Sequence, residues 1–271
     1  MDNPFALPRG TTRVRHDLKL RVARVAEVIH LTPRMTRIVL ETPDFEGFTS
    51  LSYDDHCKLF FPLPGTPLPE PTATENGLSW PPDQPRPEGR DYTPRFFEPE
   101  TNRLTIDFVL HGDGPATAWA AHAHPGDHIG VGGPRGSFVV TGTYDYYLLV
   151  GDETALPAIA RRLEELPADA RAIALIEIHD DKERQTIVPP ANTDLVWIPR
   201  NGAVPGEKLL AALKATVLPE GTGYAFVAGE ADMAKAARAH LVETLGLDPD
   251  FVKASGYWRL GEGDFDDGHA H

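Results

Sequence analysis

The segment Arg90-Asp91-Tyr92-Thr93-Pro94-Arg95 places two fixed cations, one aromatic ring and one hydroxyl on a short extended stretch of chain. Arginine can bind a pyrophosphate through a planar fork of donors, which suits Arg90 to a flavin dinucleotide. The ring of Tyr92 is suited to lie on the isoalloxazine, and the hydroxyl of Thr93 to hydrogen-bond its reactive edge. A half-exposed β-strand with a charged face has the same composition, so the neighbouring sequence must decide.

A strand, a glycine turn and a helix are predicted next. Residues 104–110 alternate at period two before turning apolar, and His111-Gly112-Asp113-Gly114-Pro115-Ala116-Thr117-Ala118-Trp119-Ala120 follows directly. Gly112 and Gly114 permit close approach of the backbone, and the amides of residues 116–118 would face an anion at the start of the helix. We therefore predict a phosphate cradle, with an ordinary strand-to-helix turn as the alternative.

A second strand, turn and helix are predicted from Tyr146 to Ala160. This order begins nucleotide-binding α/β domains, although the usual G-x-G-x-x-G is absent. Asp152 and Glu153 also place negative charge near the expected position of a pyrophosphate. We infer a nicotinamide nucleotide that binds transiently. Its predicted neighbours, at the carboxyl-terminal edge of the sheet, are Asp152, Thr154, Gly229 and Glu230.

The two halves of the chain have different patterns. The first half has strand candidates at residues 18–29, 35–40, 56–61, 104–110 and 138–140, with one helix within 111–123. The second half alternates strands at 146–150, 172–178, 195–198 and 224–228 with helices at 154–166, 207–215 and 230–245. We expect a β-barrel flavin-binding domain at 1–142 and an α/β Rossmann-like nucleotide-binding domain with a C-terminal segment at 143–271. The proline-rich stretch 62–87 is predicted to be a long surface loop.

Taken in order, these motifs resemble those of the siderophore-interacting proteins, which are flavin-dependent ferric-siderophore reductases of the ferredoxin-reductase-like group. The resemblance covers nearly the whole chain, and an ordered set of matches is far more specific than any one of them. The matching segments are 54–62, 90–95, 111–116 with Trp119, 133–137, 151–157, 228–230 and 256–259.

The resemblance implies a ferredoxin-reductase-like fold, FAD as the cofactor, NAD(P)H as the electron donor and a ferric siderophore as the small-molecule substrate. The residues expected to bind FAD are Arg90, Tyr92, Thr93, Asp107, Val109, Gly114, Ala116 and Thr117. Lys58, Arg135 and Arg259 match the basic residues around the ferric-siderophore pocket of the family. Each also has a plainer interpretation, as a strand lysine, a turn residue and a surface cation. No direct metal ligand and no acid–base catalyst is implied.

The implied activity is NAD(P)H-dependent reduction of chelated Fe(III) to Fe(II), which hard oxygen ligands bind less tightly and release. Flavin is needed because nicotinamide donates two electrons while iron accepts one. Two alternatives stay open: an NAD(P)H-dependent flavin reductase or electron-transfer flavoprotein, and a non-enzymatic siderophore-binding protein. The loop at 179–184 mixes acids with cations, so the sequence does not choose between NADH and NADPH. The siderophore class and the oligomeric state also stay open.

Composition narrows the class of protein further. With 40 acidic residues, 26 basic residues and a formal net charge of −14, the chain disfavours nucleic acid and anionic membranes as partners. Cys57 is the only cysteine, which excludes an intrachain disulfide and a cysteine-ligated iron–sulfur cluster. The sequence shows no signal peptide and no membrane-spanning run, so we expect a cytoplasmic protein. His122 and His124 would face different sides of a helix near the surface, and residues 268–271 are expected to be a disordered end.

Overall fold

The computed structural model describes residues 3–63, 66–69, 71–74, 77–112 and 114–262. The chain forms two compact units. One is Thr12–Val139, and the other runs from Val140 onward and includes the N-terminal residues as far as Thr11. The division of the protein into domains after residue 142 stays a prediction.

The Thr12–Val139 unit is built on an antiparallel sheet of seven strands in the order β7-β4-β10-β2-β3-β9-β8. The strands are β2 (Leu20–Thr32), β3 (Met35–Glu41), β4 (Cys57–Phe61), β7 (Glu88–Tyr92), β8 (Pro94–Glu98), β9 (Arg103–Val109) and β10 (His128–Gly132). Two smaller pairs are β1 (Gly10–Arg15) with β11 (Gly136–Thr141), and β5 (Thr72–Thr74) with β6 (Gly77–Ser79). The predicted strand-rich first half is confirmed.

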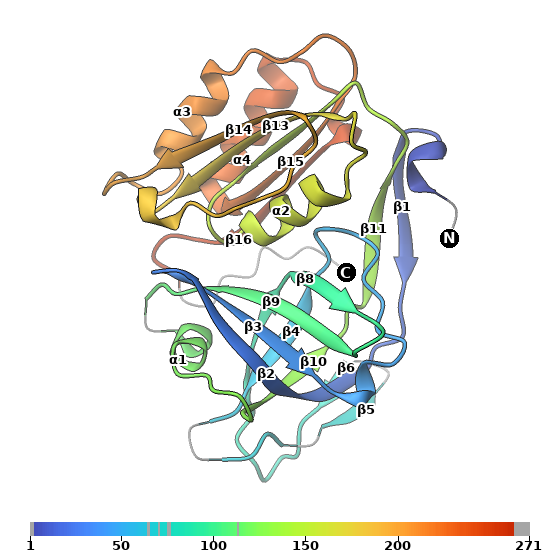
Figure 1. The fold of residues 1–271 in the computed structure, drawn as a ribbon, viewed down its shortest axis with the longest axis vertical. Helices are drawn as coiled ribbons and strands as arrows, with labels where there is room; N and C mark the ends of the chain where they lie inside the picture. Colours follow the sequence, from blue (N-terminus) through green and yellow to red (C-terminus); the bar gives the residue numbers. More distant parts are fainter. Residues whose placement is uncertain (1–2, 64–65, 70, 75–76, 113, 263–271) are drawn as a thin grey trace. The chain divides into compact units, whose positions relative to one another are not determined.

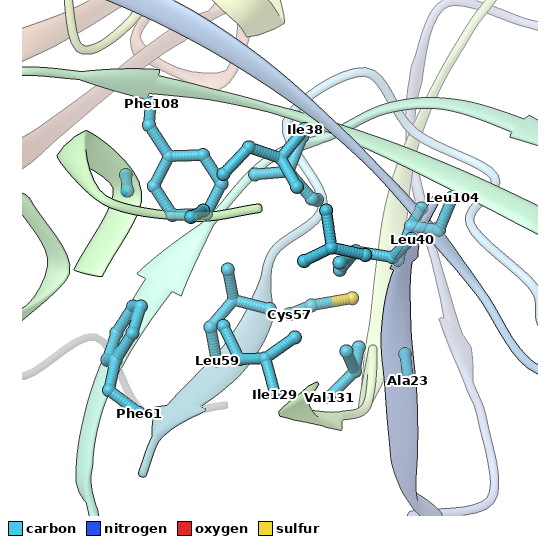
Figure 2. Close-up of a cluster of buried hydrophobic side chains, with 14 of the residues drawn as sticks. Ala23, Ile38, Leu40, Cys57, Leu59, Phe61, Leu104, Phe108, Ile129 and Val131 are labelled. Carbon is cyan, nitrogen blue, oxygen red and sulfur yellow. The ribbon is translucent and has the colours of Figure 1, made fainter. Parts of the chain in front are cut away.

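Alternation along the strands of this unit builds its core. Cys57, Leu59 and Phe61 of β4 point into the buried cluster that Figure 2 shows, whereas Lys58 between them is exposed. The only helix predicted here is observed as α1 (Pro115–Ala121), and it contributes Ala116 and Ala120 to the same core. The thiol of Cys57 is therefore part of the hydrophobic packing.

Several strands of this unit were not predicted. β10 alternates over only five residues, two of them glycines, and β1 is mostly polar, so neither gives a strong strand signal. The stretch 62–87 was predicted to be a loop, but it contains β5 and β6. Short or polar strands form because pairing with a neighbour satisfies their backbone groups, and the local sequence does not record that pairing.

The second unit contains a parallel sheet in the order β14-β13-β12-β15-β16. Its strands are β12 (Tyr146–Gly151), β13 (Arg171–Ile178), β14 (Asn192–Pro199), β15 (Gly223–Glu230) and β16 (Val252–Trp258). Its helices are α2 (Leu156–Glu165), α3 (Glu207–Ala215) and α4 (Ala231–Ala239). In Figure 1, α3 and α4 cover one face of the sheet and α2 covers the other, as predicted.

The central strands of this sheet were predictable because every residue of β12 and β15 is buried, which gives near-continuous apolar runs. β16 was not predicted, because its sequence VKASGYW mixes small and polar residues. The helix predicted at 230–245 begins one residue later and changes to π-helical geometry over His240–Thr244. No helix in the described part of the chain is long and apolar enough to cross a membrane.

Candidate functional site

Arg90 lies on β7, the strand at one edge of the seven-stranded sheet. Residues two apart in a strand share a face, and the Arg90 guanidinium lies 3.2 Å from the Glu88 carboxylate. The side chains of Arg90 and Glu88 are 31% and 52% exposed. An exposed pair of this kind contributes at most about 1 kcal/mol, so a diphosphate can replace Glu88 at little cost. The donor set at Arg90 therefore fits the predicted flavin.

Tyr92 lies on the same face as Arg90 and packs against two other aromatic rings. Its ring centroid lies 4.5 Å from that of Phe108 and 6.5 Å from that of Phe61. Burial raises the pKa of Tyr92 well above its ordinary range, so its phenol stays neutral. A neutral ring fixed on one side by Phe108 is a suitable support for an isoalloxazine. Thr93, the third predicted residue of the motif, is buried.

Asp107 is committed to arginines within the same sheet. Both of its carboxylate oxygens accept hydrogen bonds from Arg37, at 2.7 and 2.8 Å, and Arg95 lies 3.8 Å away. The carboxylate is buried, so this paired geometry stabilises β3 against β9. Val109 is the last residue of β9. A contribution of Asp107 and Val109 to FAD binding stays a prediction.

The predicted phosphate cradle is smaller than expected. Gly114 caps α1, and its carbonyl accepts the N–H of Ala118 at 2.9 Å, so this amide is not available to an anion. Ala116 and Thr117 precede the first intrahelical bond, so their N–H groups have no acceptor within the helix. The Thr117 hydroxyl donates to the His111 carbonyl at 2.8 Å and is thus held in the turn. A side-chain carbon added at Gly114 would meet nothing within 4 Å, which leaves room for a bound group.

Lys58 lies on a different face from the flavin motif. In the antiparallel register Cys57 pairs with Tyr92 and Lys58 with Asp91, so these two pairs point to opposite faces of the sheet. The Lys58 ammonium forms an ion pair with the Asp91 carboxylate at 3.1 Å, and the two side chains are 50% and 41% exposed. An anionic chelate must therefore compete with Asp91 for Lys58.

Arg135 is exposed in the connection between β10 and β11. Its backbone is fixed, because its carbonyl accepts the N–H of His16 at 2.9 Å. Beside it, the fully buried hydroxyl of Ser137 lies 2.6 Å from the carboxylate of Asp55 and 2.8 Å from the ring of His16. The rigid backbone and exposed side chain are compatible with the predicted anion contact. This supporting network could not be predicted, because Asp55, His16 and Ser137 lie far apart in the sequence.

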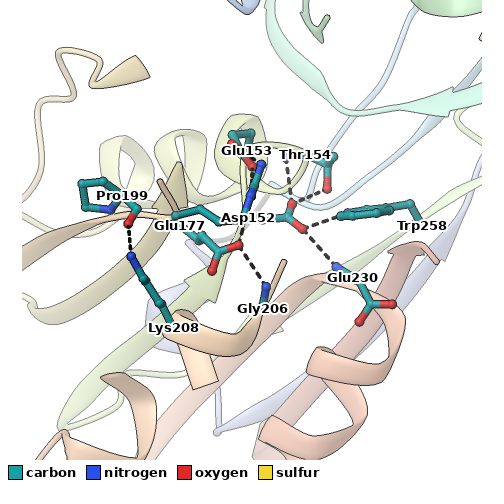
Figure 3. Close-up of polar contacts among 10 residues, drawn as sticks. Asp152, Glu153, Thr154, Glu177, Pro199, Gly206, Lys208, Glu230 and Trp258 are labelled. Atoms are coloured by element: carbon teal, nitrogen blue, oxygen red, sulfur yellow. Dashed lines mark hydrogen bonds and ion pairs between the residues drawn. The ribbon is translucent and has the colours of Figure 1, made fainter. Parts of the chain in front are cut away.

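Asp152 lies at the carboxyl-terminal end of β12 and is almost fully buried. Figure 3 shows its carboxylate surrounded by donors. One oxygen accepts the N–H and the hydroxyl of Thr154 at 2.9 and 2.6 Å. The other accepts the N–H of Glu230 at 3.0 Å and the indole N–H of Trp258 at 2.8 Å. Transient nucleotide binding was predicted from the negative charge at this position. In the structure the Asp152 carboxylate has donors inside the protein.

Glu230 is also committed internally. As the N-cap of α4 it accepts the N–H of Met233 at 2.9 Å, and its other oxygen lies 3.4 Å from the N–H of Leu260. Gly229 has a φ of 137°, and a side-chain carbon there would lie 2.5 Å from the Asp152 carboxylate. The structure thus brings together Asp152, Thr154, Gly229 and Glu230, but both carboxylates already have partners. Their role beside a nucleotide stays a prediction.

Arg200, just beyond β14, was not predicted as important. Its guanidinium lies 3.2 Å from Glu153 and 3.0 Å from Glu177, which is fully buried and also accepts the N–H of Gly206 at 2.9 Å. Burial raises the pKa of Glu153, and the neighbouring Asp152 raises it further against the opposing effect of Arg200. One arginine thus serves two buried carboxylates. The sequence could not show this, because the three residues lie on separate strand ends.

We expect Glu153→Gln to weaken the pH dependence of stability. A folded-state pKa above the unfolded value means that the folded protein binds more protons, so stability falls as pH rises from the ordinary glutamate value through the raised one. Glutamine keeps the shape but does not titrate. Melting temperatures between pH 4 and 8 should therefore fall less steeply for the variant, with about 2–4 °C for each kcal/mol removed. Superimposable curves for the two proteins would contradict this, and Glu165→Gln on exposed α2 surface is the control.

The histidines and possible metal ligands add no second site. His122 and His124 are exposed, as predicted. Across the described ranges, no group of three or more His, Cys, Asp or Glu side chains could hold a metal ion. The predicted disordered end at 268–271 lies outside the described residues.

Arg259, the third predicted chelate cation, follows β16 directly. Its guanidinium lies 3.5 Å from the Glu262 carboxylate and 4.0 Å from that of Asp232. These carboxylates are largely exposed, so the pairs are weak and an anionic ligand can displace them.

Known proteins resemble this chain over most of its length. It is 37% identical to the NADPH-dependent ferric-chelate reductase of Escherichia coli over 93% of this chain and 97% of that protein. It is 30% identical to the ferric vibriobactin reductase of Vibrio cholerae, with 86% and 87% covered. The crystal structure of a siderophore utilization protein from T. fusca superimposes with a TM-score of 0.86 at 41% identity, covering 94% of this chain and 98% of that one.

The fold prediction is confirmed by a more distant likeness. A ferredoxin NADP+ reductase from Neisseria gonorrhoeae shares the fold at 15% identity with a TM-score of 0.55, covering 83% of this chain and 91% of that one. Residues 24–138 match the siderophore-interacting FAD-binding domain, and residues 144–261 match the siderophore-interacting protein family. The chain therefore belongs to the siderophore-interacting protein family.

Proposed function

We propose that this protein is an FAD-dependent reductase that uses NAD(P)H to reduce Fe(III) in a siderophore or similar chelate to Fe(II) and so releases the metal. One observation carries the proposal. Arg90 and Tyr92 lie on the same face of an edge strand, within the region that matches an FAD-binding domain. The names of the E. coli and V. cholerae relatives support the ferric chelate as substrate. A cytoplasmic location is part of the proposal.

The chain's own residues would hold the cofactor in a defined way. Arg90 would exchange Glu88 for the diphosphate, and the amides of Ala116 and Thr117 would offer further anion contacts. The ring of Tyr92, supported by Phe108, would pack against the isoalloxazine. When bound, FAD accepts hydride from a nicotinamide and passes electrons singly, which joins a two-electron donor to a one-electron acceptor.

Nicotinamide binding is assigned to the carboxyl-terminal edge of the parallel sheet, where nucleotides bind in open α/β folds. Gly229 suits this place because its positive φ and its lack of a side chain let the backbone pass close to Asp152 at this edge. For the chelate, Lys58, Arg135 and Arg259 supply positive charge in a protein whose net charge is −14. Local cations are needed because a distant surface charge is screened beyond about 8–10 Å at physiological salt.

Anaerobic kinetics with the purified protein test this function. NADH and NADPH are each mixed with the FAD-loaded protein and with an anionic ferric catecholate or a neutral ferric hydroxamate, and Fe(II) is trapped by a selective chelator. The proposal expects nicotinamide oxidation that depends on the ferric chelate and yields two Fe(II) per nicotinamide. Turnover of added free flavin without dependence on ferric chelate would identify a flavin reductase. A protein that binds the chelate but no flavin would be a non-enzymatic carrier.

Substitutions of Lys58 and of its ion-pair partner Asp91 should change the KM for an anionic chelate in opposite directions. Lys58→Ala should raise the apparent KM for the anionic chelate, whereas Asp91→Asn should lower it by roughly two- to fivefold, since a competing exposed pair is worth about 1 kcal/mol or less. Both effects should shrink in high salt and be absent for the neutral chelate. If neither variant changes the KM, Lys58 does not contact the chelate, as its position on the opposite face of the sheet from Tyr92 would explain.

A further inference from the structure

We propose that Asp152 and Glu230 are positioning residues that fix Arg259 for an anionic ferric chelate, and that they do not act by contacting the nucleotide themselves. This inference rests on the proposed function, in which Arg259 attracts the chelate. The two acids lie at the ends of neighbouring parallel strands, β12 and β15. Figure 3 shows the Asp152 carboxylate bonded to the Trp258 indole and to the backbone of Glu230.

The chain on both sides of Arg259 is bonded to these two carboxylates. On the N-terminal side, the Trp258 indole N–H donates to Asp152 at 2.8 Å. On the C-terminal side, the Leu260 N–H lies 3.4 Å from Glu230 Oε1. Arg259 is thus flanked by a side-chain contact one residue before it and a backbone contact one residue after it.

The Asp152 carboxylate also fixes the backbone of Glu230. The same oxygen of Asp152 that accepts the Trp258 indole accepts the backbone N–H of Glu230 at 3.0 Å. Glu230 is held in turn by the N–H of Met233 at the start of α4. The parallel pairing of β15 with β16 has a register irregularity at this point, after which Glu230 faces Trp258. Side-chain bonds therefore act together with an irregular strand pairing at the point where Arg259 leaves the sheet.

Burial makes this arrangement stiff. Asp152 is 2% exposed and Glu230 is 6% exposed, so their bonds are protected from competition by water. The Arg259 guanidinium, by contrast, lies 3.5 Å from Glu262 and 4.0 Å from Asp232, and the side chains of these two acids are 51% and 79% exposed. A rigid base with a replaceable outer partner is the arrangement expected of a ligand-binding arginine, because less freedom is lost when the ligand binds.

The decisive variant is Trp258→Phe, which removes the indole N–H but keeps an aromatic ring. The measurements are KM and kcat for an anionic ferric catecholate and a neutral ferric hydroxamate, the FAD content, and the rate of flavin reduction by NADPH. We expect the KM for the anionic chelate to rise roughly five- to tenfold, part of what is lost when a charged hydrogen bond is removed. The kcat, the FAD content, the rate of flavin reduction and the KM for the neutral chelate should not change.

A double-mutant cycle separates positioning from general stability. In an Arg259→Ala background, Trp258→Phe should cause no further rise in KM, because the side chain that it positions is absent. Trp197→Phe on β14 is the matched control, since it makes the same substitution in the same sheet and should leave all constants unchanged. Asp152→Asn is the second variant. Its amide has only one acceptor oxygen, so in either orientation its NH2 group meets at least one N–H donor, which should lower the melting temperature and raise the same KM further.

The outcomes distinguish this inference from the function on which it rests. If Arg259→Ala raises the KM for the anionic chelate but Trp258→Phe leaves it unchanged, the positioning role is overturned and the proposed function stands. An equal effect of Trp258→Phe with and without Arg259 would also overturn it. If Arg259→Ala does not change the KM for any ferric chelate, Arg259 does not bind the chelate, and the positioning inference fails with that assignment.

Discussion

Replacing Arg90 with alanine should strip the protein of FAD and leave its fold intact. The guanidinium is only partly buried and bonds Glu88 and the Gly89 carbonyl, so its loss removes little from the folded state. The free energy of FAD binding should fall greatly, because hydrogen bonds to charged groups are worth about 1.5–3 kcal/mol each and arginine forms two at once. The purified variant should be colourless, and the dissociation constant for FAD, measured by quenching of flavin fluorescence, should rise by roughly 100-fold or more.

Two further variants make this result specific. Arg86→Ala removes an exposed arginine four residues earlier and should retain the flavin. Glu88→Gln removes the carboxylate that competes for Arg90 and should tighten FAD binding severalfold. A yellow Arg90→Ala protein with unchanged FAD affinity would show that this motif is a charged strand face, the plainer interpretation of the sequence.

Three of the predicted anion-binding cations hold a carboxylate of their own. Arg90 holds Glu88, Lys58 holds Asp91 and Arg259 holds Glu262. Each pair is exposed enough to be weak, so exchange for a ligand costs little, yet each nearby carboxylate remains after the exchange and repels further negative charge. A protein with this arrangement should bind moderately charged ligands with less penalty than highly charged ones. This follows from contacts that composition alone cannot show.

The fold was predictable where local pattern and tertiary environment agree. The strands β12, β13 and β15 are buried on both faces and read as apolar runs, and α2, α3 and α4 alternate with the strands of this sheet along the chain. β16 was missed because pairing with β15, rather than its own residues, makes it a strand. Arg259 follows this strand directly, so the contact of Trp258 with Asp152 beside Arg259 was not predicted either.

The candidate site was predictable in its residue types but only partly in their roles. Arg90 and Tyr92 lie together on one face because residues two apart in a strand must do so. Asp152 was expected to face a nucleotide, because it follows an apolar strand and precedes a helix. The donors that occupy it come from Glu230 and Trp258, which are distant in sequence. No local pattern identifies such partners, and a buried carboxylate requires them.

The substitution Gly229→Ala should block reduction of the flavin by nicotinamide without removing the flavin. Its new methyl group would lie 2.5 Å from the Asp152 carboxylate, and a φ of 137° is strained for any residue with a side chain. The edge at which the nucleotide is proposed to bind must therefore shift. Because misplacement of about 1 Å costs on the order of 100-fold in rate, anaerobic stopped-flow traces should show at least that loss with NADH and NADPH.

Gly221→Ala is the matched control for this variant, because it repeats the same strain at the other edge of the same two strands. Gly221 has a φ of 105°, its added carbon would lie 2.7 Å from Asp145, and Asp145 accepts the N–H of Thr222 just as Asp152 accepts that of Glu230. Gly221→Ala should lose less stability by thermal unfolding, because the Asp145 side chain is 50% exposed and can move, whereas Asp152 is 2% exposed. Only Gly229→Ala should lose nicotinamide-driven reduction.

The flavin of Gly229→Ala should still be reduced by dithionite, and it should then reduce a neutral ferric chelate at the normal rate. The neutral chelate is the right probe, because a displaced Asp152 would also disturb Arg259 and so weaken anionic chelates. Normal bleaching of the flavin by a nicotinamide in Gly229→Ala would place the nucleotide elsewhere on the protein. Equal loss of nicotinamide-driven reduction in Gly221→Ala would instead attribute the effect to general strain in β15, since the two glycines flank that strand at opposite ends.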